Sequence, residues 1–135
     1  MRVVLDTNIL LQSLSRRSIV RPIWDGFLQE KFTLIVSNSI LLEYDEILSE
    51  KTSESVAFNV ICLINEAVNT ELVEVWYEWN AITFDVDDNK FFDAAISGRA
   101  DYIVTNDSHF NVVKDIEFPK VNIIAAEHFL NLINS

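Results

Sequence analysis

Glycine, proline and cysteine are scarce in this sequence. It holds two glycines and two prolines among 135 residues, and half of its residues are hydrophobic. This composition excludes collagen-like, linker-like and disordered chains, which are rich in glycine or proline or poor in hydrophobic residues. Cys62 is the only cysteine, so no disulfide forms within the chain. The length predicts a single domain, residues 1–135, with a core that needs no disulfide.

Long hydrophobic runs are also missing. The uncharged stretches, such as residues 32–42, are shorter than the ~18 residues that a membrane-spanning helix needs. Asp6 interrupts the first hydrophobic run almost at once, which is not typical of a signal peptide. The sequence therefore predicts a cytoplasmic protein that does not associate with a membrane.

Positive charge is scarce as well. Ten lysines and arginines stand against 21 aspartates and glutamates, which gives a formal net charge of −11. Proteins that bind nucleic acid over a broad face do so with clustered lysine and arginine, so the charge balance alone argues against such a face.

Five short hydrophobic runs are typical of parallel strands that are buried on both faces, because they are rich in β-branched residues and end in polar ones. They are residues 3–5, 33–36, 72–75, 102–104 and 121–124. Segments with helical spacing lie between them. This alternation predicts an α/β fold, a three-layer α/β/α sandwich with a mostly parallel central sheet. Functional sites of such sheets form beyond the carboxyl ends of the strands.

Aspartates follow two of these strands directly. Asp6 ends the run at residues 3–5, and Asp107 stands in the same relation to the run at residues 102–104. One aspartate at a strand end is commonly the N-cap of the next helix. Two aspartates that leave parallel strands toward the same edge of the sheet indicate a shared site more strongly.

Helical phase indicates that Glu43 belongs to the same site. At about 100° per residue, Ile40, Tyr44 and Leu48 share one hydrophobic face, and Glu43 lies on its flank. The segment begins at a predicted strand end, so its first turns face the carboxyl edge of the sheet. A solvated glutamate at the margin of the helix is the alternative interpretation.

The densest acidic stretch is residues 85–89, which on its own is typical of a solvated loop. Phase again separates its members. Asp88 points in the direction of the hydrophobic face of the helix that follows, whereas Asp93 is expected on the polar side with Asn89 and Ser97. Asp88 is therefore the preferred site residue, Asp93 is the first alternative, and Asp85 or Asp87 comes after it.

Four acids from four segments would then meet in one pocket. They are Asp6, Glu43, Asp88 and Asp107. Two like charges about 4 Å apart repel by about 4 kcal/mol at an effective dielectric constant near 20. A divalent cation removes this repulsion, and all-oxygen ligation suits Mg²⁺ or Mn²⁺. His109 and His128 are isolated in the sequence, so a zinc site is not expected.

Four blocks of the sequence carry a family pattern. They are VVLDTNIL at residues 3–10, SNSILLE at 37–43, DDNKFF at 87–92 and ADYIVTNDSHF at 100–110. Together they resemble the PIN-domain family, and most closely the toxins of bacterial toxin–antitoxin pairs that are related to VapC-type ribonucleases. Asn106 departs from the pattern, which often has a basic residue or glycine there.

The resemblance implies a metal-dependent endoribonuclease on a Rossmann-like sandwich, with one or two Mg²⁺ or Mn²⁺ ions. It implies catalytic roles for Asp6, Glu43, Asp88 and Asp107, metal ligation by Asp6, Asp88 and Asp107, and supporting polar groups at Asn8 and Thr105. The implied partners are an RNA substrate, an antitoxin protein and a second copy in a homodimer. The expected products carry 5′-phosphate and 3′-hydroxyl ends.

Two other functions stay open on the residues alone. A phosphotransfer or phosphatase-type Mg²⁺-binding domain also places an aspartate after its first strand, but haloacid-dehalogenase-like phosphatases need a second acid where this chain has Asn8. A catalytically inactive PIN-like binding module is the other alternative. The aromatic residues Trp76, Tyr77 and Trp79 are expected in the core or in a subunit interface rather than stacked on bases.

Overall fold

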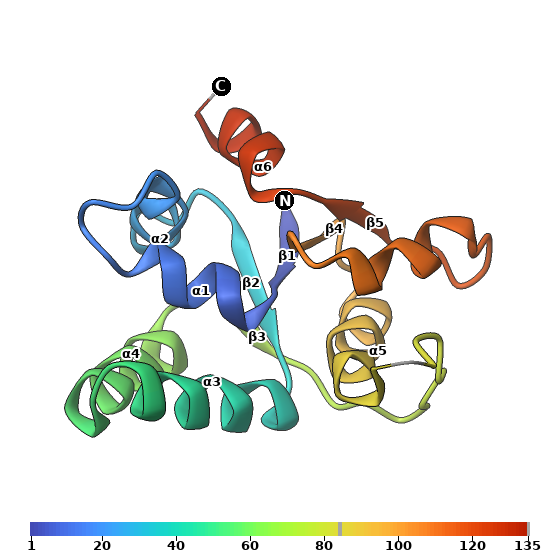
Figure 1. The fold of residues 1–135 in the computed structure, drawn as a ribbon, viewed down its shortest axis with the longest axis horizontal. Helices are drawn as coiled ribbons and strands as arrows, with labels where there is room; N and C mark the ends of the chain where they lie inside the picture. The colour runs from blue at the N-terminus through green and yellow to red at the C-terminus, as the bar shows by residue number, and fades with distance from the viewer. Residues whose placement is uncertain (84, 135) are drawn as a thin grey trace.

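A parallel sheet lies between two layers of helices in the computed structural model, which describes residues 1–83 and 85–134 (Figure 1). In these residues the sheet has five strands in the order β3-β2-β1-β4-β5, and each neighbouring pair is parallel. The strands are β1 (Arg2–Leu5), β2 (Thr33–Val36), β3 (Thr70–Leu72), β4 (Tyr102–Val104) and β5 (Asn122–Ile124). The predicted α/β/α sandwich with a parallel sheet is confirmed.

The third strand begins and ends earlier in the chain than the predicted residues 72–75. Leu34 donates its backbone N–H to the Asn69 carbonyl, and Val73 donates to the Val36 carbonyl. These bonds are the first and last that β2 offers to β3, because β2 itself ends at Val36. The length of β2 therefore sets the length of β3.

The helices divide between the two faces of the sheet (Figure 1). One face carries α1 (Thr7–Ser13), α2 (Arg21–Leu28), α3 (Asn38–Lys51) and α4 (Glu54–Glu66). The other carries α5 (Asn89–Ser97) and the 3₁₀ segments η1 (Val86–Asp88) and η2 (Ser108–Asp115). The last helix, α6 (Ala126–Ile133), packs against α2. Among the described residues, no helix is long and apolar enough to cross a membrane.

Local sequence explains where the helices start. Ser37 caps α3 by accepting a hydrogen bond from Ile40 N, and Ser53 caps α4 in the same way through Val56 N. Pro22 lies in the first turn of α2, where its missing N–H costs no helical hydrogen bond. The start of α3 is therefore fixed directly after β2, and this sets the rotation of the helix that carries Glu43.

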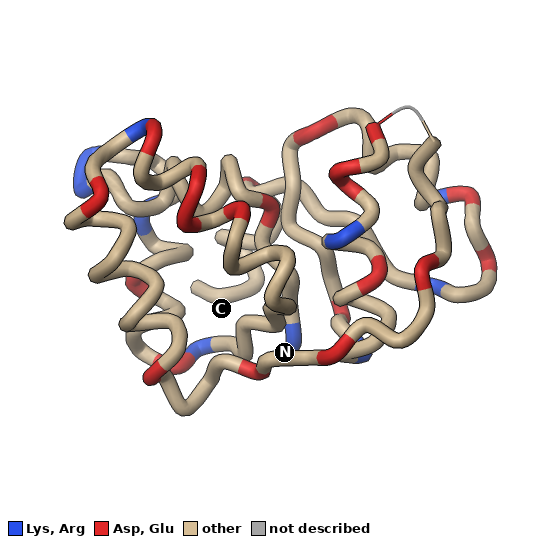
Figure 2. Tube along the Cα trace, turned by 90° about the horizontal axis from the view of Figure 1, so that it is seen from below, with Lys and Arg blue, Asp and Glu red and all other residues tan. Residues whose placement is uncertain are grey.

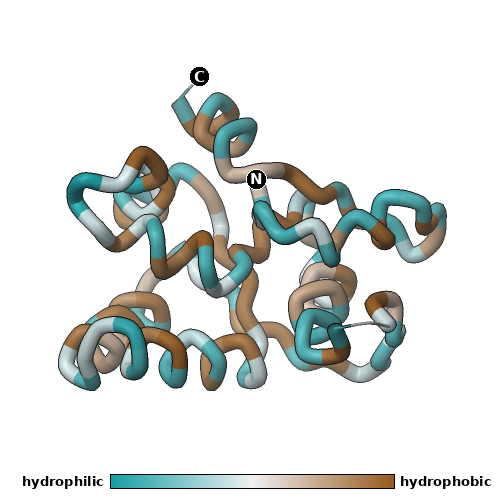
Figure 3. The backbone as a smooth tube through the Cα atoms, in the orientation of Figure 1, coloured by the Kyte–Doolittle hydropathy of each residue, from teal (hydrophilic) through white to brown (hydrophobic). Residues whose placement is uncertain are grey.

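The core runs along both faces of the sheet, where hydrophobic positions of the strands meet those of the helices (Figure 3). Val3, Val4 and Leu34 are fully buried in it. Tyr44 is also fully buried, and its hydroxyl donates to the Leu5 carbonyl at the end of β1. This bond fastens α3 to the strand end that Asp6 follows.

The strand order changes direction at β1. The chain passes from β1 to β2 and β3 on one side, and then returns to place β4 and β5 on the other. Asp6 N donates to the Val104 carbonyl at 3.0 Å, so the carboxyl ends of β1 and β4 lie side by side. Ligand sites of open parallel sheets form at such a reversal.

Gly98 at the end of α5 has no room for a side chain. A Cβ there would lie 2.7 Å from Cγ2 of Ile35, which is fully buried and cannot move aside. We expect Gly98→Ala to lower the free energy of unfolding by about 2 kcal/mol, because overpacking a close-packed core costs that much. Urea denaturation measures it. Gly26→Ala is the control, since its Cβ would meet no atom closer than 3.3 Å, and the account of Gly98 fails if both variants are equally stable.

Candidate functional site

Asp6 is a buried carboxylate at the carboxyl end of β1, with 7% of its surface exposed. It occupies the N-cap position of α1, but its side chain makes no capping hydrogen bond. Oδ2 instead accepts a hydrogen bond from Thr105 Oγ1 at 2.7 Å. Burial raises the pKa of Asp6, the Thr105 hydrogen bond opposes this, and the charges of Asp107 and Glu43 add to it. The geometry does not fit a helix cap, which was the alternative role for this residue.

The loop after β4 places Asp107 next to Asp6. Thr105 is buried and uses its hydroxyl twice, as donor to Asp6 and as acceptor from Asp107 N at 3.0 Å. Asp107 Oδ1 accepts from His109 N at 2.9 Å, which caps η2. Asp6, Asn8 and Asp107 line a cleft of about 220 Å³. The loops after β1 and β4 therefore place their carboxylates, Asp6 and Asp107, in the same crevice.

Asn106 has a structural role in this loop. Its Oδ1 accepts a hydrogen bond from Ala126 N at 3.0 Å, at the start of α6. The short amide side chain thus ties the loop that carries Asp107 to the last helix. A basic residue or glycine, which the family pattern often has at this position, would not supply that acceptor.

Glu43 reaches the crevice from α3 and is held from two directions. Oε2 accepts a hydrogen bond from Thr7 Oγ1, at the start of α1. Oε1 forms an ion pair with Lys90 Nζ at 2.8 Å, from the first turn of α5. Sequence patterns did not single out Lys90; its place two residues after Asp88, as a cation in an acidic stretch, was the one signal available.

Asp88 lies at the junction of η1 and α5 with 14% of its side chain exposed. Its Oδ2 atom is fully buried and accepts no hydrogen bond from the described residues. Burial raises the pKa of Asp88 to about 7, and the charges of Asp85, Asp107 and Asp6 contribute. A carboxyl group with this pKa is about half protonated near neutral pH.

His109 lies against Asp85, Asp88 and Asp107, and these three acids together with Asp6 form the carboxylate cluster. His109 Nδ1 lies 3.2 Å from Asp85 Oδ2, 3.5 Å from Asp107 Oδ1 and 3.6 Å from Asp88 Oδ2. Desolvation lowers the pKa of His109, but the carboxylates of Asp107, Asp85 and Asp88 raise it above its ordinary value overall. His109 reaches these acids because η2 begins directly after Asp107 and turns the chain back over them.

The residues present fit a divalent cation. Among the described residues, Asp85, Asp88 and His109 each place one ligand atom within 4.8 Å of the other two. Asp6 and Asp107 stand beside them, since both raise the pKa of Asp88. The buried Asp88 oxygen without a hydrogen bond is the atom that a cation would satisfy. The carboxylate oxygens suit Mg²⁺ or Mn²⁺, whereas the imidazole of His109 suits softer metals.

Asn89 and Asp93 are buried, contrary to the expectation that they lie on the polar side of their helix. Asn89 exchanges two hydrogen bonds with the backbone of Ile82, at 2.8 and 2.9 Å. Asp93, 5% exposed, accepts from Trp79 N at 3.1 Å. The extended segment after β3 covers this side of α5, and both side chains satisfy its backbone. Burial raises the pKa of Asp93, and none of the four predicted site acids contributes to that rise.

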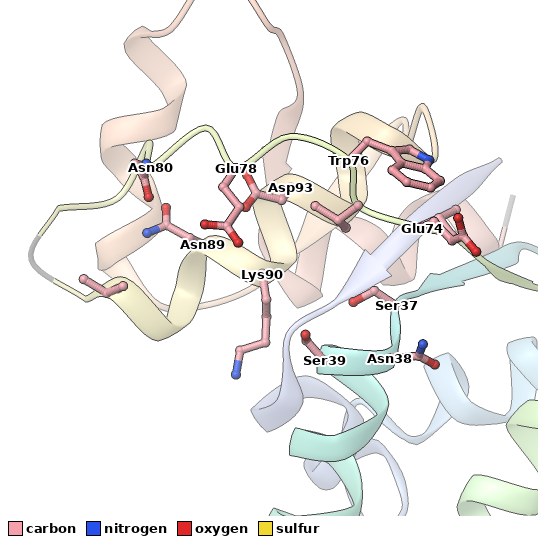
Figure 4. Close-up of a pocket in the computed structure, with 13 residues that line it drawn as sticks. Ser37, Asn38, Ser39, Glu74, Trp76, Glu78, Asn80, Asn89, Lys90 and Asp93 are labelled. Carbon is pink, nitrogen blue, oxygen red and sulfur yellow. The ribbon is translucent and has the colours of Figure 1, made fainter.

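A groove of about 580 Å³ lies between the start of α3, the helix α5 and the segment after β3 (Figure 4). Ser37 and Ser39 at the start of α3 face Lys90 and Asp93 of α5 across it, and the segment that carries Trp76 forms another wall. Trp76 is 84% exposed and Tyr77 is also exposed, so the expectation of a core position was wrong for both. A subunit interface or a stacking surface remains open for them.

Acidic residues far outnumber basic ones along the whole trace (Figure 2). The four predicted site acids nevertheless come from separate elements. The structure places them after β1, in α3, at the start of α5 and after β4. Asp6 and Asp88 have raised pKa values to which the other members of the group contribute. Proximity of these acids is therefore a property of the fold rather than of composition.

Comparisons with known proteins point to one family. The family model described as PIN domain matches residues 2–109. The solved structure of VapBC2 from Rickettsia felis, bound to a DNA fragment from its promoter, is similar with a TM-score of 0.63 at 17% identity, over 93% of this chain and 98% of that one. VapBC-1 from nontypeable Haemophilus influenzae has a TM-score of 0.60 at 17% identity, over 94% and 99%. No curated protein matches significantly.

Proposed function

Because the chain belongs to the PIN-domain family, we propose that it is a Mg²⁺- or Mn²⁺-dependent endoribonuclease that hydrolyses phosphodiester bonds of RNA. The observation that carries this proposal is the Asp88 carboxyl group, whose buried Oδ2 accepts no hydrogen bond from the described residues and whose pKa is raised by the neighbouring carboxylates. Ionising such a group without a cation costs free energy, and a bound cation offsets this cost.

The proposed metal ligands are Asp6, Asp88 and Asp107, held directly or through water, with Asp85 and His109 close to the same atoms. When bound, Mg²⁺ or Mn²⁺ supplies a water of lowered pKa and neutralises charge on the phosphoryl oxygens. Thr105 keeps Asp6 oriented through its 2.7 Å hydrogen bond, and Asn8 lies on the lining of the same cleft.

Glu43 is proposed to orient the attacking water and to accept its proton. Thr7 and Lys90 each occupy one of its oxygens, and each oxygen keeps a second lone pair for a water molecule. As the water oxygen bonds to phosphorus, the bond from phosphorus to the 3′ oxygen breaks and that oxygen takes up a proton. The products are a 5′-phosphate and a 3′-hydroxyl.

The biological role that fits this site is the toxin of a toxin–antitoxin pair acting in the cytoplasm. The VapBC structures support it through their fold, and the charge of −11 suits a partner with basic residues. We further propose that the chain acts as a homodimer. An antitoxin that covers the carboxylate crevice would inhibit the nuclease and neutralise the charge there.

The test is cleavage of several RNAs of different sequence in Mg²⁺, in Mn²⁺ and in chelator, with single-stranded DNA as the competing substrate. We expect RNA to be cut in the metal-containing reactions only, leaving 5′-phosphate ends that a phosphate-dependent exonuclease recognises. Transfer of phosphate from acetyl phosphate to the protein, detected by mass, would favour a phosphotransfer domain instead.

A pair of isosteric variants shows which of Asp88 and Asp93 takes part in catalysis. We expect Asp88→Asn to slow cleavage by about 100-fold or more, the scale on which loss of a charged catalytic group acts. Asp93→Asn should stay within about 3-fold of the wild-type rate, because an amide oxygen still accepts the Trp79 N–H and Asp93 lies outside the carboxylate cluster. Initial rates at saturating Mn²⁺ measure both. A large loss of the cleavage rate in Asp93→Asn alone would assign the catalytic role to Asp93 instead of Asp88.

A further inference from the structure

Lys90 forms the contact that joins the two helical walls of the crevice. Its Nζ lies 2.8 Å from Glu43 Oε1, across 47 positions of sequence, and the two side chains are only 22% and 23% exposed. The other Glu43 oxygen is held by Thr7 from α1. Glu43 is therefore clamped between two donors that belong to opposite faces of the sheet.

Helix stability does not explain a lysine at this position. Lys90 is the second residue of α5, where the positive end of the helix dipole disfavours a cation. Its partner lies on another helix, so the pair is not the i,i+4 contact that supports an isolated helix. Holding two long side chains in one geometry also costs conformational entropy.

The position of Lys90 relative to the groove is also informative. Lys90 lines both the 580 Å³ groove and the 440 Å³ cleft that contains Glu43, Glu46 and Asp87. Figure 4 shows its side chain extending from α5 away from Glu78 and Asn89. The ammonium group therefore lies between the groove and the cleft that contains Glu43, and Glu43 is its hydrogen-bonded partner.

We propose that Lys90 is a positioning residue of the nuclease site, which fixes the Glu43 carboxylate toward the crevice. This rests on the proposed function of the site. Glu43 then works as an orienting group for water rather than as a ligand of the metal, because its charge is already paired with an ammonium group. Loss of Lys90 leaves the metal ligands in place and lets Glu43 leave its working position.

The test compares Lys90→Met and Lys90→Arg with Lys31→Met. The control removes the same charge from an exposed lysine beside the amino end of β2, at the opposite edge of the sheet. We expect Lys90→Met to lower kcat for RNA cleavage by about 100-fold with KM within about 3-fold, as misplacement of a reacting group does. Lys90→Arg restores kcat to within about 10-fold of wild type, because a guanidinium still pairs with Glu43.

Mn²⁺ affinity, measured by calorimetry on the same proteins, separates positioning from metal binding. We expect Lys90→Met to bind Mn²⁺ as tightly as wild type or more tightly, since removing a cation makes the crevice more negative. Equal kcat in Lys90→Met and Lys31→Met overturns the inference, and so does a loss of Mn²⁺ affinity that parallels the loss of kcat. A wild-type protein that cleaves no RNA in any metal overturns the proposed function itself, and this role with it.

Discussion

Replacing Asp6 by asparagine should abolish metal-dependent RNA cleavage, with a fall in kcat on the order of 1,000-fold. The amide still accepts the Thr105 hydrogen bond, so the local geometry is kept, but the charge that faces the proposed metal is gone. The melting temperature without metal should stay the same or rise. Burial and the charges of Asp107 and Glu43 raise the pKa of Asp6, which means that its ionised form destabilises the empty site.

Asp45→Asn provides the matched control for this variant. Asp45 is an exposed residue of α3 that lines neither the cleft with Asp6 nor the cleft with Glu43, so the same change of charge there should leave cleavage unaltered. Cleavage assays in Mn²⁺ and thermal unfolding in chelator measure the two effects separately. An Asp6→Asn protein that cuts RNA at the wild-type rate would remove Asp6 from the mechanism.

The second large effect is a fall in metal-free stability as the pH rises from about 4 to about 7. The pKa of Asp88 is raised from 3.8 to about 7, so the folded protein binds a proton that the unfolded chain releases near pH 4. The contribution of Asp88 to the free energy of unfolding is therefore fully present below pH 4 and is lost as the pH rises through 7. Allowing for solvent screening, the loss is about 2 kcal/mol, or about 6 °C in Tm.

Thermal unfolding in chelator across this pH range tests the prediction. Asp88→Asn should flatten the dependence, while Asp45→Asn should keep it. Adding Mn²⁺ to the wild-type protein at pH 7.5 should restore the lost stability, because a ligand that binds only the folded state stabilises it. A wild-type melting temperature that stays level or rises between pH 4 and 7 would show that Asp88 carries no such penalty.

The sequence predicted the parts of the site that depend on strand ends and helical phase. Asp6 and Asp107 follow short parallel strands, and parallel strands bring their carboxyl ends to one edge whatever their order. Glu43 could be placed because Ser37 fixes the first turn of α3 and Tyr44 fixes its rotation. The metal, the catalytic roles and the RNA substrate stay predictions until they are measured.

Side chains that hydrogen-bond to irregular backbone segments could not be predicted in this way. Asn89 and Asp93 are polar residues at polar helical positions, yet the segment after β3 lies over them and uses them as hydrogen-bond partners. The path of that segment has no periodicity to reveal it. Trp76 and Tyr77 lie on the same segment and are exposed, so the core is excluded for them and the expected subunit interface stays a prediction, because aromatic character indicates burial only on average.

Contacts between charged side chains that are distant in sequence could not be predicted either. Lys90 meets Glu43 from a separate helix, and His109 reaches Asp85 only because η2 folds back after Asp107. No spacing rule connects these residues, since their contact depends on how α3, α5 and η2 pack around the sheet. The acidic residues could be grouped by strand ends, but the cations among them could not.

Calorimetric titration of the metal-free protein with Mn²⁺ at pH 7, in buffers of different ionisation enthalpy, tests the shared carboxylate site most directly. We predict that Mn²⁺ binds and that Asp88 releases about half a proton per protein, because a carboxyl group with a pKa of about 7 is half protonated at pH 7 and must ionise to ligate the metal. Asp107→Asn should weaken binding by about 10-fold or more. Absence of binding, or binding that neither releases protons nor depends on Asp107, would contradict the account.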